Sequence, residues 1–167
     1  MADPNKIPSA QTPPLVISRV FPARPELVFR AWSSAEHVRR WFCPAAYTVA
    51  DARVEFRVGG AFDICMRSPQ GQDHWTRGRY TEIVPHSRLI IDMNAVAERD
   101  RVLFRAYTVV RFTEERGGTR LEVTQSYTLF DPAAAAMIQG APIGWGQTLD
   151  RLAVEVARIQ NAAGLQS

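Results

Sequence analysis

The sequence has little lysine and no concentrated block of positive charge. Lys6 is the only lysine among 20 basic residues, and Arg39-Arg40 is the only adjacent pair of arginines. The formal net charge of the 167-residue chain is +3. Proteins that bind nucleic acids usually carry a basic stripe or cluster. We therefore expect no nucleic-acid partner.

Cysteine is also scarce, and no apolar run approaches the roughly 20 residues that span a bilayer. Cys43 and Cys65 form no CxxC motif and have no histidine at a metal-binding spacing. We expect them to be small apolar side chains, with no disulfide framework, no zinc site and no other cofactor. The N-terminus lacks the apolar core of a signal peptide. This predicts a cytoplasmic protein that does not insert into a membrane.

The clearest pattern in the sequence lies near its end, at 144–159. Large apolar residues recur there at spacings of four, three, four and three, which places them on one helical face: Trp145, Leu149, Leu152, Val156 and Ile159. Charged residues should lie largely off this face, namely Asp150, Arg151, Glu155 and Arg158. Such a short helix is marginal alone in water, so it needs a partner surface.

Most of the preceding chain predicts strands. From 47 to 129 apolar and polar residues alternate between turn signals, which favours roughly six antiparallel strands. A further strand is expected at 15–21, followed by a helix with Pro25 in its first turn. A second helix at 35–41 would open with a Ser33–Glu36 capping box, and Asp131 would cap a later alanine-rich helix. These elements predict an α+β fold.

The chain length predicts one domain. We assign a flexible N-terminal tail to 1–14, where four prolines stand among polar residues, a single domain to 15–162 and a C-terminal tail to 163–167. We expect Gly140, Pro142 and Gly144 to separate the alanine-rich helix from the final one.

Several short motifs occur in an order that resembles a known family. They include Pro25-Glu26-Leu27-Val28-Phe29, Trp41-Phe42-Cys43-Pro44, Gly78-Arg79-Tyr80-Thr81-Glu82 and Gly144-Trp145 with Leu149-Asp150-Arg151-Leu152. Each motif is weak alone, but their order over 15–158 is specific. The set resembles homologues of the C-terminal domain of the activator of the 90-kDa heat-shock chaperone ATPase, which belong to the START-like (SRPBCC) superfamily.

The resemblance implies the helix-grip fold of START-like and Bet v-like proteins. In that fold a curved antiparallel sheet of six to seven strands surrounds a long C-terminal helix, with two short helices after the first strand and a cavity between sheet and helix. The resemblance also implies a homodimer, and its name points to a chaperone partner and the stress response. The eukaryotic co-chaperone carries a separate N-terminal chaperone-binding domain, for which we expect no room in this chain.

Under this fold the residues that face the cavity can be predicted from strand and helix periodicity. The expected ligand-binding set is mostly apolar and aromatic: Trp32, Trp41, Phe42, Phe62, Ile64, Met66, Tyr80, Met93, Tyr107, Gln125, Tyr127, Met137, Trp145 and Leu149. For any single member, core packing is the alternative. Gln125 is the most informative, because a buried amide without partners would cost about 1–3 kcal/mol. We expect it to bond to a neighbour such as Tyr107, to water or to a ligand.

No catalytic constellation is recognisable in the sequence, so enzymatic activity is left open. We expect His37 and His86 to be exposed and His74 to lie at the cavity mouth, and no Ser, Cys or Thr stands in a nucleophile setting. The favoured function is binding of a small hydrophobic or aromatic molecule. One alternative is a cyclase- or hydrolase-like enzyme that uses the same cavity. The other is a chaperone-interacting module, which a large exposed apolar patch outside the cavity would indicate.

Overall fold

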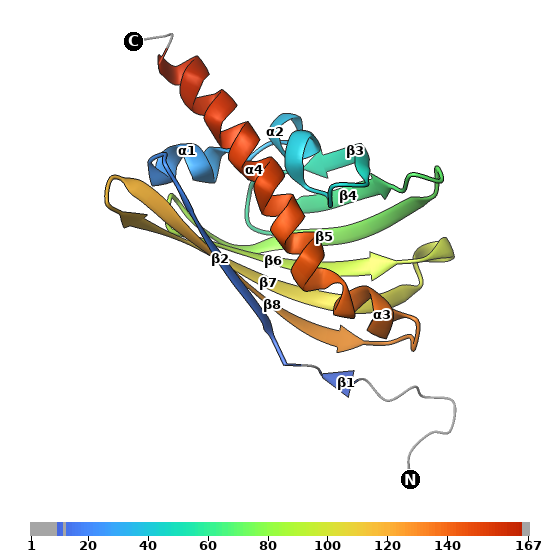
Figure 1. The fold of residues 1–167 in the computed structure, drawn as a ribbon. Helices are drawn as coiled ribbons and strands as arrows, with labels where there is room; N and C mark the ends of the chain where they lie inside the picture. The colour runs from blue at the N-terminus through green and yellow to red at the C-terminus, as the bar shows by residue number, and fades with distance from the viewer. Residues whose placement is uncertain (1–9, 12, 165–167) are drawn as a thin grey trace.

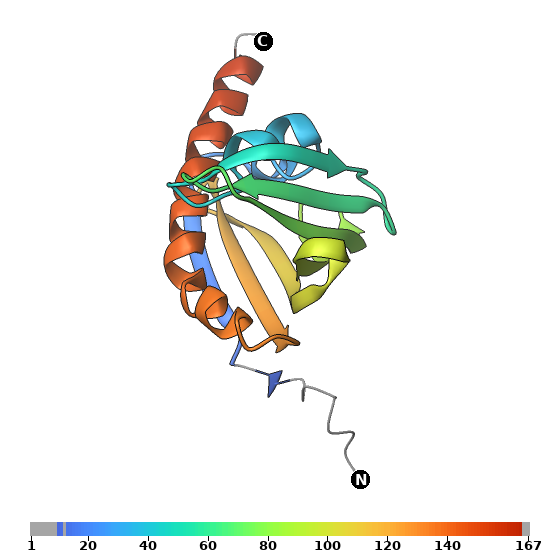
Figure 2. The same cartoon turned by 90° about the vertical axis from the view of Figure 1, so that its right-hand side faces the viewer.

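The computed structural model describes residues 10–11 and 13–164. Its strands form one antiparallel sheet that curls around a long helix, α4 (Ala141–Gly164) (Figure 1). In the view turned by 90°, α4 runs along the open side of the curled sheet (Figure 2). The predicted helix-grip α+β architecture is therefore confirmed.

In the described part of the chain the sheet has seven long strands and one very short strand. Along the sheet the order is β8-β7-β6-β5-β4-β3, and both β1 and β2 pair with β8 on its other side. A single 3-10 turn, η1 (Glu98–Asp100), connects β6 to β7. The strands are β1 (Ala10–Gln11), β2 (Leu15–Phe21), β3 (Thr48–Val54), β4 (Ala61–Arg67), β5 (Asp73–Val84), β6 (Arg88–Val96), β7 (Val102–Glu115) and β8 (Gly118–Leu129).

Alternation along each strand separates a buried inner face from a charged outer face. The inner residues of β7 include Ala106, Thr108 and Val110, all buried. On the outer face, the Arg105 guanidinium forms two hydrogen bonds of 2.8 Å to the Asp92 carboxylate on β6. Many of the other arginines form similar ion pairs with carboxylates on neighbouring strands, including Arg67–Asp73, Arg77–Asp63, Arg88–Glu82 and Arg111–Glu122.

The predicted inward orientation of Tyr107 is wrong. Tyr107 lies opposite Asp92 on the outer face, and the Arg105 guanidinium stands 5.5 Å from the centre of its ring. The neighbouring Thr108 occupies the inner position instead. A shift of one residue in the assumed register exchanges the two faces of a strand. Both faces of β7 carry apolar residues, so alternation alone did not fix this register.

The two helices between β2 and β3 have the predicted positions, α1 (Pro25–Arg30) and α2 (Ala35–Trp41). The cap of α2 differs from the prediction. The Ser34 hydroxyl accepts a hydrogen bond from the His37 backbone N–H at 3.3 Å, whereas the Ser33 hydroxyl donates to the Arg30 carbonyl at 2.7 Å. The capping residue is thus Ser34, and the Ser33–Glu36 capping box does not form.

The C-terminal helices begin at other residues than predicted. In α3 (Ala134–Gln139) the N-cap is Ala133, and the Asp131 carboxylate accepts the Ala133 N–H at 2.9 Å in the preceding turn. Helix α4 begins at Ala141, so Gly144 lies inside it. Pro142 is tolerated there because the first N–H groups of a helix have no intrahelical partner.

At both ends, regular secondary structure extends beyond the domain boundaries predicted at 15 and 162. Ala10 and Gln11 pair with Leu129 and Thr128 of β8, so this part of the predicted N-terminal tail belongs to the sheet. The other residues of the predicted tail before position 13 lie outside the described residues. At the other end α4 continues to Gly164, beyond the predicted boundary at 162, and 165–167 are likewise outside the described part.

The core lies between the inner face of the sheet and the apolar side of α4. All five apolar residues of the predicted helical face are buried: Trp145, Leu149, Leu152, Val156 and Ile159. Burying a side chain of this size contributes about 1.5–3 kcal/mol relative to exposure. In the described part of the chain no helix has both the length and the apolarity needed to cross a bilayer.

Candidate functional site

Most of the residues predicted to line a cavity form a packed aromatic core. Trp32, Trp41, Phe42, Phe62 and Tyr80 are at most 4% exposed. Their rings meet edge to face, with centroids 4.6 Å apart for Trp32–Trp41, 5.1 Å for Phe42–Phe62 and 5.6 Å for Phe62–Tyr80. Such pairs add about 0.5–1.5 kcal/mol each beyond their buried area. These rings fill the space between the sheet and the helices by contacting one another.

Two polar side-chain atoms of this aromatic cluster bond to the backbone, whereas the buried Trp32 indole N–H has no partner among the described residues. The Trp41 indole N–H donates to the Ala31 carbonyl at 2.9 Å, and the Tyr80 hydroxyl donates to the Trp32 carbonyl at 3.1 Å. Burial raises the pKa of Tyr80, so its hydroxyl stays protonated. The Tyr80 bond ties the segment between α1 and α2 to β5, and the Trp41 bond ties the same segment to α2.

The other apolar members of the predicted set divide between core and surface. Ile64, Met93 and Leu149 are buried. Met66 is partly buried and packs against the core. Met137 on α3 is 42% exposed. Tyr127 is the one member of the predicted set that lines the groove between β8 and α3, so the set as a whole does not converge on an open pocket.

An open groove lies between the end of β8, the start of β2 and α3. Its volume is about 360 Å³, within the range of about 300–1,000 Å³ typical of small-molecule sites. We call it the β8–α3 groove. Its lining is almost entirely apolar: Pro13, Pro14, Leu15, Tyr127, Leu129, Ala135, Ile138, Gln139 and Pro142.

A buried hydrogen-bond network adjoins this groove and is centred on Gln125. The Gln125 amide nitrogen donates to Thr108 Oγ1 at 2.8 Å. Its amide oxygen accepts from the Tyr127 hydroxyl and, at 3.0 Å, from the Trp145 indole N–H. The Thr108 hydroxyl in turn donates to the Ala106 carbonyl at 3.2 Å. Gln125 is 6% exposed, so the expected bonding to neighbours is confirmed, but the partners do not include Tyr107.

This network fixes the state of Tyr127, the one phenol that lines the groove. Burial raises the pKa of Tyr127, so the phenol keeps its proton and donates it to Gln125. The phenolic oxygen retains lone pairs that can accept a hydrogen bond. Tyr127 thus belongs both to the lining of the groove and to the buried Gln125 network.

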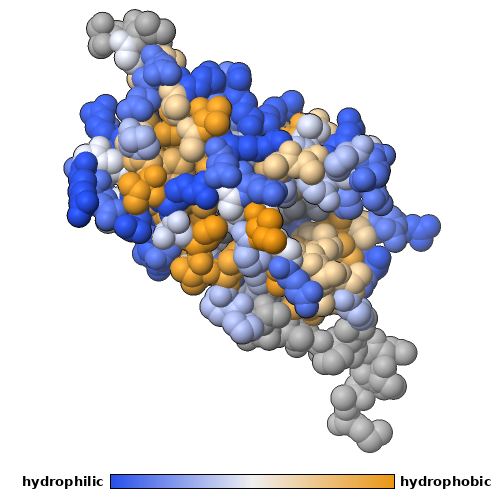
Figure 3. All heavy atoms as spheres, in the orientation of Figure 1, coloured by the Kyte–Doolittle hydropathy of each residue, from blue (hydrophilic) through white to orange (hydrophobic). Residues whose placement is uncertain are grey.

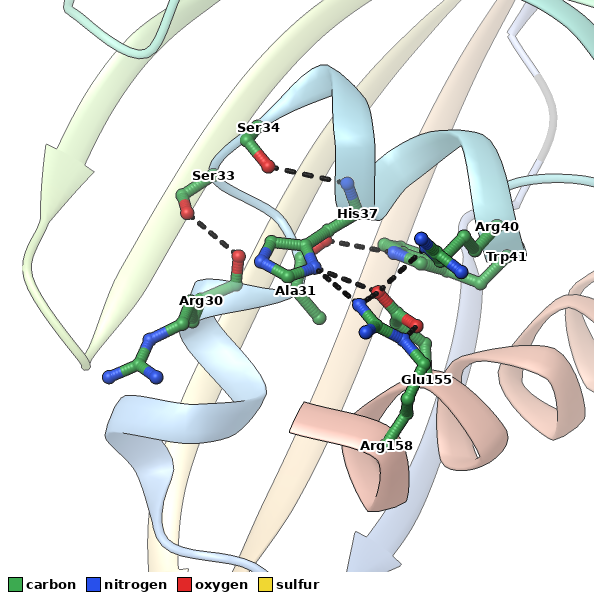
Figure 4. A network of polar contacts seen from close by, with 9 residues as sticks. All are labelled: Arg30, Ala31, Ser33, Ser34, His37, Arg40, Trp41, Glu155 and Arg158. Carbon is green, nitrogen blue, oxygen red and sulfur yellow. Dashed lines mark hydrogen bonds and ion pairs between the residues drawn. The ribbon is translucent and has the colours of Figure 1, made fainter. Parts of the chain in front are cut away.

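A second polar cluster joins α2 to α4 around Glu155, as Figure 4 shows. Arg158 donates to the Glu155 carboxylate from Nε at 2.6 Å and from Nη2 at 2.9 Å. His37 Nδ1 lies 2.8 Å from Glu155 Oε2, and Arg40 Nε lies 3.8 Å from the same oxygen. The expectation that Glu155 lies off the buried face is wrong, since it is only 2% exposed. His37 is also not free in solvent, because its ring contacts this carboxylate.

The Glu155 cluster has a defined protonation pattern. Burial raises the pKa of Glu155, but the hydrogen bonds from Arg158 and His37 outweigh it and hold this pKa below its ordinary value. An ionised carboxylate only accepts hydrogen bonds, so His37 Nδ1 must carry the proton. Within the described residues, no Ser, Thr or Cys side chain bonds to the His37 ring. The pair fixes α2 on α4 and lacks a nucleophile.

The remaining candidate groups lie away from the β8–α3 groove. Cys43 Sγ contacts the Arg151 guanidinium at 2.9 Å, and burial raises the pKa of the Cys43 thiol despite that charge. His74 packs against the Tyr47 ring, and His86 is exposed as predicted. Among the residues that the structure describes, no group of three His, Cys, Asp or Glu side chains could hold a metal ion.

Comparison with known proteins gives a consistent family match. The sequence model of the family described as "Activator of Hsp90 ATPase homolog 1-like protein" matches residues 22–157. No curated protein sequence matches the chain.

Solved structures resemble the chain over nearly its whole length. A Rhizobium leguminosarum protein is 30% identical, with a TM-score of 0.75, over 90% of this chain and 97% of its own. A Chromobacterium violaceum protein is 26% identical, with a TM-score of 0.73, over 86% of this chain and 96% of its own. A Silicibacter pomeroyi protein named AHSA1 shares the fold at 22% identity and a TM-score of 0.73, over 87% of this chain and 98% of its own.

Proposed function

Because the chain belongs to the family of activator of Hsp90 ATPase homolog 1-like proteins, we propose that it binds a small apolar molecule in the β8–α3 groove. The helix-grip fold is consistent with ligand binding but hosts many functions, so the proposal depends on the site itself. The observation that carries it is the apolar lining next to the Gln125 network.

The groove favours an apolar ligand because it offers little to a charged one. Its lining contains no charged side chain, and Gln139 and Tyr127 are the lining residues with polar side chains. Removing apolar ligand surface from water there contributes roughly 25 cal/mol per Å². A charged ligand would lose its hydration without gaining a partner charge.

Tyr127 adds a preference for one hydrogen-bond donor on the ligand. Its proton is engaged by Gln125, so its free lone pairs suit a ligand O–H or N–H. A single hydrogen bond of this kind contributes about 0.5–1.5 kcal/mol. The proposed ligand is thus largely apolar or aromatic, with one donor group that reaches Tyr127.

N-phenyl-1-naphthylamine tests this proposal, because it is neutral, apolar, fluorescent in apolar surroundings and carries one N–H. Fluorescence titration should show saturable binding to the native protein. Ala135→Trp places a bulky ring in the groove and should weaken binding at least tenfold. Ala136→Trp is the matched control, since Ala136 is the next residue of α3, is also exposed and does not line the groove.

A Tyr127→Phe variant separates the hydrogen bond from the shape of the groove. We expect it to weaken binding of this probe about two- to tenfold, the equivalent of one hydrogen bond. Equal affinities for the native protein and Ala135→Trp would contradict the location of the site. Absence of saturable binding to the native protein would contradict the proposal itself.

The assembly and cellular location stay proposals. A homodimer would show as twice the chain mass in light scattering, and a single-chain mass would contradict it. A cytoplasmic location is a further proposal, which fractionation of the source cells can test. A chaperone partner is the alternative use of the domain, and the family description is its support.

A further inference from the structure

A second hollow of about 240 Å³ lies between α2 and α4, apart from the β8–α3 groove. It is lined by Arg40, Arg151, Val154, Glu155 and Arg158, and we call it the arginine groove. Three guanidinium groups share it with one carboxylate, so its lining carries a net charge of +2, that is, +3 from the arginines and −1 from Glu155. The whole chain has a net charge of +3, so this is a strong local excess.

The single carboxylate does not satisfy the three arginines. Glu155 is engaged by Arg158 in two short hydrogen bonds and by His37 at 2.8 Å, whereas Arg40 Nε stays 3.8 Å away (Figure 4). Each guanidinium has five N–H donors. Most donors of Arg40 therefore remain available to an oxyanion from outside the chain.

Arg151 has no acidic partner in the described part of the chain. Its Nη1 contacts Cys43 Sγ at 2.9 Å, and its Nη2 donates to the Ala45 carbonyl at 2.9 Å. These contacts fix the side chain against the loop after α2 without neutralising its charge. An arginine held in place at the edge of a groove is preorganised for a carboxylate, whose geometry matches the guanidinium fork.

Exposure decides which kind of anion suits this groove. The side chains of Arg40 and Arg158 are 48% and 42% exposed, so solvent and salt screen their attraction for a small free anion. Val154 lines the same groove, is 73% exposed and offers an apolar contact that a free anion would not use. On the face that carries α4, apolar patches lie among hydrophilic side chains (Figure 3). Arginine beside apolar surface is typical of protein interfaces.

We propose that the arginine groove docks an acidic peptide segment of a partner protein. Carboxylates of the segment pair with Arg40 and Arg151, and an apolar side chain between them packs on Val154. The arginine groove shares no lining residue with the β8–α3 groove, so this proposal does not depend on ligand binding there.

Fluorescence anisotropy with a labelled peptide tests the proposal. The probe is a short synthetic peptide with a central leucine flanked on each side by two aspartates, and its control has asparagines in their place. The native protein should bind the acidic peptide and not the asparagine peptide. Arg40→Gln should weaken binding at least fivefold. Arg39→Gln is the matched control, because Arg39 is adjacent, pairs with Asp51 at 3.2 Å and does not line the groove.

Two further arms test the apolar contact and the class of ligand. Val154→Asp places a like charge beside the carboxylates at an exposed position and should abolish binding of the acidic peptide. Inorganic phosphate, compared with sodium chloride at equal ionic strength, should not compete specifically. Equal losses in Arg40→Gln and Arg39→Gln, or unchanged binding in Val154→Asp, would overturn the proposal. Specific displacement by phosphate would also overturn it, since it would identify a small-anion site instead.

Discussion

Replacing Gln125 with leucine should destabilise the protein although the new side chain is apolar and similar in size. Gln125 accepts hydrogen bonds from Tyr127 and Trp145, both of which are buried. In Gln125→Leu these two donors lose their acceptor. Thr108 is affected less, because its hydroxyl still donates to the Ala106 carbonyl.

The size of the effect follows from the cost of unpaired buried donors. Each unsatisfied donor costs about 1–3 kcal/mol, so two cost about 2–6 kcal/mol. Leucine regains part of this through its apolar surface, which leaves an expected loss of about 2–5 kcal/mol. Small domains have a free energy of unfolding of about 5–15 kcal/mol, so the variant should still fold.

Urea denaturation followed by circular dichroism measures the free energy of unfolding, and a double-mutant cycle with Tyr127→Phe isolates the network. Tyr127→Phe removes one donor but leaves Trp145 bonded to Gln125, so it should cost about 0.5–1.5 kcal/mol. In the Tyr127→Phe background, Gln125→Leu leaves only one donor unpaired. Its loss of unfolding free energy should therefore be about 1–3 kcal/mol smaller than in the native background. Losses that add within about 0.5 kcal/mol would refute the reasoning.

Three further predictions concern the core and the ionisable groups. Leu149→Ala should lower the free energy of unfolding in urea by about 2–5 kcal/mol. Val154→Ala, at an exposed position of the same helix, should change it by less than about 0.5 kcal/mol. Equal effects would contradict the assigned helix face. The folded-state pKa of Glu155 is lowered, so its stabilisation is present above the unfolded pKa, near 4.5, and disappears as pH falls through the folded value. The difference in unfolding free energy between the native protein and Glu155→Gln should therefore shrink on acidification below about pH 4.5, and a constant difference would argue against this assignment. Burial raises the thiol pKa of both Cys43 and Cys65. Ellman's reagent at pH 7.4 should therefore label them slowly in the folded protein and quickly in urea. Fast labelling of either thiol in the folded protein would contradict its burial.

The fold could be predicted because its strongest signals are local. The apolar repeat from Trp145 to Ile159 predicts a helix with one buried face, and Pro25 marks the start of α1. Turn residues between alternating segments mark the hairpins. Each of these signals depends on residues a few positions apart, and the structure follows them closely.

The parts that could not be predicted depend on contacts between distant segments. His37 and Glu155 are 118 positions apart, and only the packing of α2 on α4 brings them together. In β7, apolar residues on both faces left the choice between Tyr107 and Thr108 open to a one-residue error. Composition predicts an aromatic interior around Trp32 and Phe62, but it does not tell whether those rings line a cavity or fill it.

Native mass spectrometry of the purified protein, before and after exposure to a lipid and metabolite extract, tests the central claim most directly. We predict a reproducible extra mass in the small-molecule range on the native protein and on Ala136→Trp, released on denaturation and absent from Ala135→Trp. A native protein that stays empty after exposure to the extract would contradict ligand binding. An adduct that Ala135→Trp retains in full would contradict the β8–α3 groove as its site.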